Sequence, residues 1–112
     1  MNRMIAVLSL GLGLAAPAMA QDTDERDGAV ALCLAQDRAE AVCECAADRL
    51  RDEIGGNYDT YEELGRVYAA KREEGMGLAT AWEAALDEMG LGLVQTNPMG
   101  QAHRDAIDAC AA

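Results

Sequence analysis

The chain has 112 residues, in which 20 Asp and Glu outnumber nine Lys and Arg, and its formal net charge is −11. This length suits a single small domain and is too short for a dinucleotide-binding domain or a barrel enzyme. The acidic balance argues against nucleic-acid binding, because recognition of phosphates depends on Lys and Arg. We therefore expect one small domain that binds no nucleic acid.

The first twenty residues have the pattern of a secretory signal peptide. Arg3 provides a basic start, residues 5–16 are almost entirely apolar, and Ala18 and Ala20 are the small residues that a signal peptidase requires. The apolar stretch is shorter than the roughly 20 residues that span a bilayer, and no later segment is apolar enough to do so. We predict cleavage after Ala20 and a periplasmic or secreted mature protein, with no membrane insertion.

The rest of the chain divides into a short polar start and one helical domain. Residues 21–28 are polar, and we expect a flexible acidic N-terminus there. Over residues 29–112, apolar side chains recur at helical spacing and no stretch alternates with a period of two. The sequence therefore predicts an all-α fold, a small bundle of four to five short helices stapled by two disulfides.

Start and stop signals place the helices along the chain. Capping boxes begin at Asp37 and at Thr60, and Asn97 followed by Pro98 is typical of a helix start. Glycines are expected to end the second helix after Ile54, the third before position 75 and the fourth at position 90. The expected buried faces carry Val42, Ala46, Leu50 and Ile54; then Tyr61, Leu64 and Tyr68, with Val67 beside them; then Leu78, Ala81, Trp82, Ala85, Leu86 and Met89; and finally Ala106, Ile107 and Cys110.

The four cysteines of an exported chain predict two disulfides. Cys43 and Cys45 are unsuited to each other, because side chains two residues apart on a helix point about 200° apart. This leaves Cys33–Cys43 with Cys45–Cys110, or Cys33–Cys45 with Cys43–Cys110. We favour the second pairing, because Cys43 lies on the expected buried face of its helix and Cys110 also faces inward.

An alternative is that the cysteines carry chemistry. Cys43 and Cys45 form a Cys-x-Cys pair that could serve in thiol redox, or could bind copper or zinc together with His103. The chain contains no Cys-x-x-Cys and no paired histidines, so structural disulfides remain the favoured interpretation. We expect no cofactor.

Acidic side chains stand four residues apart along the second predicted helix. Arg49 is expected to pair with Asp52 and Glu53, and Arg51 with Asp48, which offsets part of the repulsion between like charges. Such a row is typical of a solvated face, and its more specific interpretation is a docking surface for a basic protein partner. This acidic face consists of Glu40, Glu44, Asp48 and Asp52.

Nothing in the sequence indicates catalysis. Cleavage of the leader removes Ser9, the only serine, so Ser-His-Asp chemistry is excluded. A Cys-His pair would compete with disulfide formation. We interpret His103 as a residue at the surface or boundary of the last helix and expect the protein not to be an enzyme.

In size, leader, helix content and cysteine usage, the chain resembles two groups of bacterial periplasmic proteins. One group is the small acid-stress chaperones, and the other is the immunity proteins that block a secreted toxin. The resemblance is one of architecture and assigns no residue. It implies an exported, non-enzymatic interaction, inhibitor or adaptor module, with an acid-stress chaperone as a further alternative.

Overall fold

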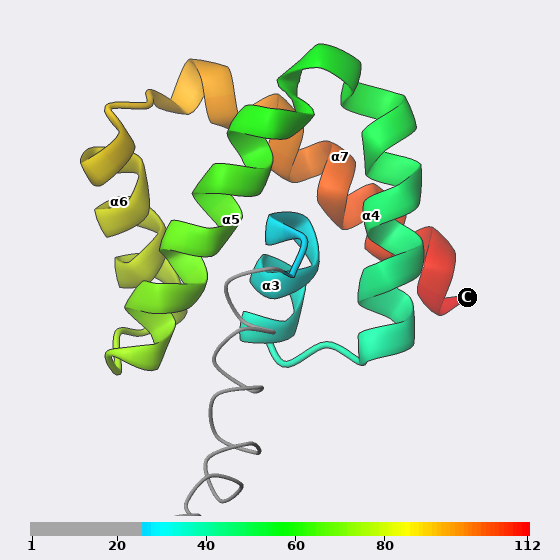
Figure 1. The fold of residues 1–112 in the computed structure, drawn as a ribbon, viewed down its shortest axis with the longest axis horizontal. Coiled ribbons are helices and arrows are strands. Elements are labelled where there is room, and N and C mark those ends of the chain that lie inside the picture. Colours follow the sequence, from blue (N-terminus) through cyan, green and yellow to red (C-terminus); the bar gives the residue numbers. More distant parts are fainter. Residues whose placement is uncertain (1–25) are drawn as a thin grey trace, which may run out of the picture.

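The computed structural model describes residues 26–112, in which it contains five α-helices, one short 3-10 helix and no strand (Figure 1). The predicted leader, the predicted cleavage after Ala20 and residues 21–25 lie outside this range. None of the described helices is long and apolar enough to cross a membrane. The all-α prediction is confirmed, with helices α3 (Gly28–Ala35), α4 (Glu40–Ile54), η1 (Gly55–Asn57), α5 (Tyr58–Glu73), α6 (Leu78–Met89) and α7 (Leu93–Ala111).

Helix α3 is short and lies in the middle of the molecule. Its eight residues read Gly-Ala-Val-Ala-Leu-Cys-Leu-Ala, with no polar side chain. A helix that is apolar all round is stable only when neighbours cover it on every side. Figure 1 shows α3 between α5 and α4, with α6 beyond α5. The two outer helices complete the domain, since α6 packs on α5 and α7 packs on α4.

The start of α3 is fixed by Asp27. One carboxylate oxygen accepts hydrogen bonds from the backbone N–H of Ala29 at 2.8 Å and of Val30 at 3.3 Å, as an N-cap does. The other oxygen accepts from the Tyr58 hydroxyl at 2.6 Å and from Arg51 at 3.0 Å. One side chain thus ties α3 to α4 and α5. The first described helix therefore begins at Gly28, directly after this cap.

Two predicted helix starts are wrong. Asp37 does not cap α4: its φ of 67° is left-handed, and its N–H bonds to the Leu34 carbonyl to close α3. Helix α4 instead begins after Ala39. Helix α7 begins after Gly92, whose N–H donates to the Gln95 side chain at 3.1 Å. Pro98 is the sixth residue of that helix and removes only one backbone hydrogen bond there.

The other boundaries follow the sequence closely. Helix α5 begins at Tyr58, two residues before the expected Thr60, because η1 leads directly into it. Helix α4 ends at Ile54 and α6 at Met89, and the glycine after each has a positive φ, as predicted stops require. The expected inner faces are buried at Ala46, Leu50, Tyr61, Leu64, Tyr68, Ala81, Ala85, Leu86, Ala106 and Ile107, and only partly buried at Val42, Ile54, Val67, Trp82, Met89 and Cys110. The prediction is wrong for Leu78, which is the first residue of α6 and is 52 % exposed.

Helices α3 and α5 touch through their backbones. A Cβ placed on Gly28 would collide with the Glu62 carbonyl, and one placed on Gly65 would collide with the Gly28 carbonyl. Any larger residue at either position would force the two helix axes apart. Because α3 is the centre of the core, this close crossing determines how tightly the rest can pack.

We predict that Gly65→Ala lowers the free energy of unfolding by about 2 kcal/mol or more, because overpacking at this crossing outweighs the better helix propensity of Ala. The matched control is Gly56→Ala, where a Cβ would meet nothing within 4 Å. That variant should stay within about 0.5 kcal/mol of the wild type. Urea denaturation of both oxidised variants measures the difference. Equal stability of the two variants would contradict the close backbone contact of α3 and α5 at Gly65.

Candidate functional site

The cysteines form two disulfides, Cys33–Cys43 and Cys45–Cys110, with Cα–Cα distances of 5.5 and 6.0 Å. The number of disulfides is as predicted, but the favoured pairing of Cys33 with Cys45 and Cys43 with Cys110 is wrong. Cys43 lies in the first turn of α4, faces α3 and is fully buried beside Cys33. Cys45 points to another side of α4, along which α7 packs.

The pairing leaves no thiol for the proposed Cys-x-Cys chemistry. All four cysteines are oxidised, and Cys43 and Cys45 are each bonded to a different helix. His103 forms no hydrogen bond with either cysteine, and its side-chain hydrogen bond is with the Tyr61 hydroxyl. Within residues 26–112, no group of three or more His, Cys, Asp and Glu side chains is placed to hold a metal ion. The structure therefore does not bring Cys43, Cys45 and His103 together.

The second disulfide fixes the last helix. Cys45–Cys110 closes a loop with a sequence separation of 65 residues and ties the end of α7 to α4. A loop of this length corresponds to about 4 kcal/mol of stabilisation in the chain-entropy treatment. It holds α4 and α7 side by side, which creates the groove described below.

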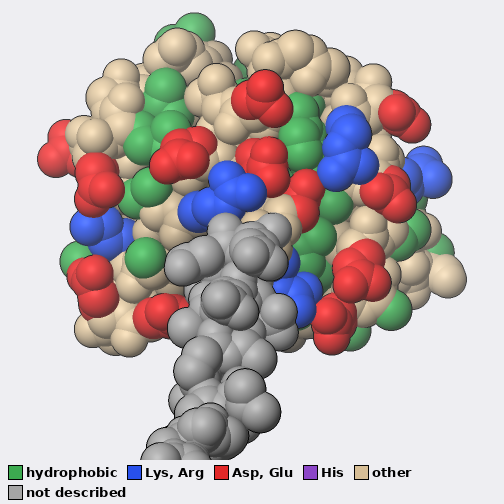
Figure 2. Space-filling view, viewed as in Figure 1, with side chains coloured by type: hydrophobic (Ala, Val, Ile, Leu, Met, Phe, Trp, Pro, Cys, Tyr) green, Lys and Arg blue, Asp and Glu red, His purple; other side chains and the backbone are tan. Residues whose placement is uncertain are grey.

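The predicted acidic face is exposed along the outer side of α4. Glu40 pairs with Arg26 at 3.2 Å, and Asp48 pairs with Arg51 at 3.0 Å as predicted. Asp27 is the second partner of Arg51. The expected pairs of Arg49 are wrong, since no carboxylate of the described residues lies within 4 Å of it. Figure 2 shows carboxylates spread over the visible face of the molecule, with Lys and Arg side chains among them.

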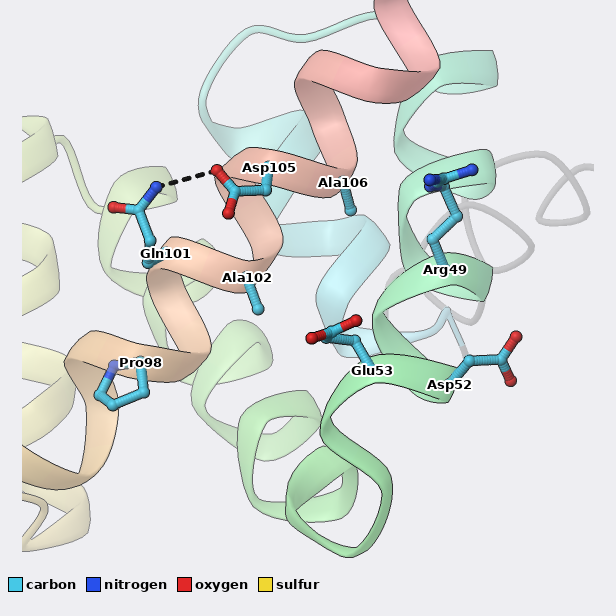
Figure 3. A pocket seen from close by; sticks show the side chains of 8 residues that line it. All are labelled: Arg49, Asp52, Glu53, Pro98, Gln101, Ala102, Asp105 and Ala106. Carbon is cyan, nitrogen blue, oxygen red and sulfur yellow. Dashed lines mark hydrogen bonds between the residues drawn. The ribbon is translucent and has the colours of Figure 1, made fainter.

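A groove of about 660 Å³ separates α4 from α7 (Figure 3). Glu53 extends from α4 toward Ala102 of α7, and Asp52 points outward at the rim. Asp105 lies on the α7 wall and accepts a hydrogen bond from Gln101 at 2.9 Å. Among the residues described, none of these three carboxylates has an ion-pair partner. The groove is thus an acidic site built from two helices, of which the sequence had indicated only Asp52.

His103 is buried, which corrects its interpretation as a surface or boundary residue. Only 2 % of it is exposed, and its Nδ1 lies 2.6 Å from the Tyr61 hydroxyl on α5. The two rings meet edge to face, with centroids 5.3 Å apart. The sequence held a signal for this burial, because His103 stands three and four residues before Ala106 and Ile107 on the inner face of α7. The partner, 42 residues away, gave no such signal.

Burial lowers the pKa of His103 to about 4, with Arg104 adding to the shift and Asp27 opposing it. The imidazole is therefore neutral at neutral pH. Desolvation also raises the pKa of Tyr61, which keeps its proton. The Tyr61 hydroxyl has no acceptor other than Nδ1 of His103 among the described residues. We therefore infer that the Tyr61 O–H donates its hydrogen bond to Nδ1. The imidazole proton then lies on Nε2.

A second hollow, of about 330 Å³, lies beside this pair and is lined by residues of α3, α5, α6 and α7. Tyr68 and Trp82 line it with their rings edge to face at 5.9 Å. Nε2 of His103 and the Tyr68 hydroxyl are both buried, and neither has a partner within hydrogen-bond distance in the described part of the chain. The Gln36 side chain, which also lines the hollow, lies near the Tyr68 hydroxyl and opposes the rise in its pKa that burial causes. The sequence reasoning assigned no function to any of these residues.

No protein family, curated protein or solved structure matches this chain.

We predict that peptide mapping of the oxidised protein finds Cys33 joined to Cys43 and Cys45 joined to Cys110. Trypsin leaves Cys43 and Cys45 in one peptide and cannot separate the two pairings. A glutamyl endopeptidase cuts after Glu44, between the two cysteines, so that non-reducing mass spectrometry after both digests resolves them. A cross-linked peptide containing Cys33 and Cys45 would contradict the structure.

We predict that His103 makes the protein less stable in acid. Because its folded pKa of about 4 lies below the ordinary value of 6.5, the unfolded chain binds the proton more tightly. The contribution is fully present above pH 6.5 and falls by about 3 kcal/mol as the pH drops through 4. The stability advantage of the wild type over His103→Gln should therefore shrink between pH 7 and pH 4, as measured by urea denaturation. For the control Ile107→Val, the difference in the free energy of unfolding from the wild type should be the same at every pH. A difference for His103→Gln that is also independent of pH would refute the prediction.

Proposed function

We propose that this protein is an exported, non-enzymatic binding module that receives a basic segment of a protein partner in the groove between α4 and α7. The observation that carries the proposal is the Glu53 carboxylate, which extends into the groove without an ion-pair partner in the described chain. The leader sequence and the two disulfides support an oxidising, extracytoplasmic compartment such as the periplasm.

The charges around the groove favour a cationic ligand group. Asp52 at the rim and Asp105 on the opposite wall add to Glu53, and Arg49 is the only basic residue among those that line the groove. A Lys or Arg side chain entering between α4 and α7 would gain ion pairs that the free protein does not make. Carboxylates arranged in this way also speed the approach of a basic partner and make association sensitive to salt.

The rest of the acidic face extends this surface along α4. Glu44 and Asp48 are exposed on the same helix, and the chain as a whole has a net charge of −11. Such a field attracts basic partners over about one Debye length, roughly 8–10 Å at physiological salt. An inhibitor or adaptor of a basic protein fits this arrangement, because binding would need no chemistry from the module itself.

We predict that a photo-crosslinking amino acid at Gln101, which lines the groove, captures one discrete partner in the native cell. The same amino acid at Thr80, exposed on α6, is the matched control and should not capture it. Raising NaCl from about 50 to about 500 mM should weaken the Gln101 adduct. Replacing Gln101 leaves every carboxylate of the groove in place.

The captured segment then allows a quantitative test by calorimetry. Asp52→Asn combined with Glu53→Gln should weaken binding of the corresponding peptide about tenfold or more, as expected for lost charge pairs. The control Glu83→Gln with Asp87→Asn, on exposed positions of α6, removes the same charge elsewhere and should change affinity much less. If both double variants weakened binding equally, affinity would depend on the net charge of the protein and not on the groove carboxylates. A captured segment that is acidic would also exclude the proposal.

A further inference from the structure

The hollow beside His103 has the build of a small-molecule site. Its volume of about 330 Å³ lies at the small end of ligand pockets. Its floor is made of buried side chains, with Tyr61 and Tyr68 each 1 % exposed and Ile107 2 % exposed. Its rim is made of exposed residues, among them Leu78 and Arg104. A ligand would therefore pass exposed side chains at the rim and rest on buried aromatic ones.

Two polar atoms in this hollow lack a partner within the described residues. Nε2 of His103 bears the imidazole proton, since Nδ1 accepts from Tyr61, and the Tyr68 hydroxyl supplies a second donor. A buried donor left without an acceptor is a costly arrangement, and native proteins keep few of them. Both side chains line the same hollow and belong to different helices. An acceptor group bound in this hollow would supply the partner that these atoms lack.

Arg104 adds a positive charge at the rim. Its guanidinium donates to Gln101 at 2.8 Å and has no carboxylate within 4 Å among the described residues. The guanidinium also lies close to Gly100, where the absence of a side chain keeps the pocket wall open. A planar guanidinium is the donor that best matches a carboxylate.

We propose that this pocket binds a small aromatic carboxylate, whose ring packs against Trp82 and Tyr68 and whose carboxylate accepts hydrogen bonds from His103, Tyr68 and Arg104. The aromatic walls select a planar apolar body, and the three donors select the anionic group. This site is separate from the α4–α7 groove and does not depend on the function proposed for it.

Trp82 reports directly on occupancy, because it is the only tryptophan of the chain and lines the pocket. The experiment titrates the oxidised protein with 3-phenylpropionate and follows tryptophan emission. We expect a saturable change with a stoichiometry of one. Two probes of nearly the same shape accompany it: 3-phenylpropanamide, which lacks the charge, and ethylbenzene, which has no polar group.

Three variants separate the contributions. Arg104→Gln, at an exposed position, should weaken 3-phenylpropionate about tenfold and leave the amide nearly unchanged. The matched control Arg49→Gln removes an arginine from the other groove and should leave both probes unchanged. Tyr68→Phe should weaken the carboxylate severalfold while the protein stays as stable as the wild type or becomes more stable, because the hydroxyl it removes has no partner.

The proposal is overturned if neither Trp82 emission nor the His103 ring resonances in NMR spectra change saturably up to about 10 mM 3-phenylpropionate. Ethylbenzene binding as tightly as the carboxylate would also overturn it, since the hollow would then be an apolar cavity only. Equal loss of carboxylate affinity in Arg104→Gln and Arg49→Gln would attribute binding to general charge and reject the site. Failure of any of these leaves the groove between α4 and α7 untouched, because its tests use different residues and a different ligand.

Discussion

The fold depends on the burial of α3. An eight-residue helix without a polar side chain cannot be stable in water, and α5 and α4 cover most of it, leaving Ala31, Leu34 and Ala35 only partly buried. The cover is close because Gly28 and Gly65 allow the backbones of α3 and α5 to touch. Asp27 then binds α3 to α4 and α5 at one end, and the Cys33–Cys43 disulfide joins α3 to α4 at the other. The small domain thereby gains through cross-links what its thin core does not supply.

The two ends of α3 differ in whether nearby polar side-chain atoms have hydrogen-bond partners. At Asp27, each carboxylate oxygen has two partners, and the result is a satisfied network that fixes the domain's start. In the pocket near the other end, His103 and Tyr68 each keep one buried polar atom without a partner among the described residues. The first arrangement stabilises the fold, whereas the second costs stability. Nε of Arg66, outside the pocket, is the third buried side-chain atom without a partner in the described chain. The pocket differs from Arg66 in that a bound ligand could remove the cost of its unpaired atoms.

How far the sequence predicts this structure depends on whether a feature is local. Helix α6 was placed with the right bounds because its apolar stripe and Gly90 agree with each other. The predicted start of α7 was too late, because Asn97–Pro98 is a strong local signal for a helix start. The observed N-cap, Gly92, has no side chain and therefore gives no such signal. Periodicity showed that Cys43 and Cys45 face different sides of α4. It could not show that α3 lies on one side and α7 on the other, so the pairing was wrong. The same holds for the contact of His103 with Tyr61 and for both hollows, which exist only once helices distant in sequence have packed.

Helix α7 links the two candidate sites, because each uses a different face of it. Pro98, Gln101 and Asp105, spaced by three and four residues, line the acidic groove against α4. Gly100, Arg104 and Ile107 follow the same spacing on the adjacent face and line the aromatic pocket. Gln101 and Arg104 are joined by a hydrogen bond of 2.8 Å, so the rim of one site is tied to the wall of the other.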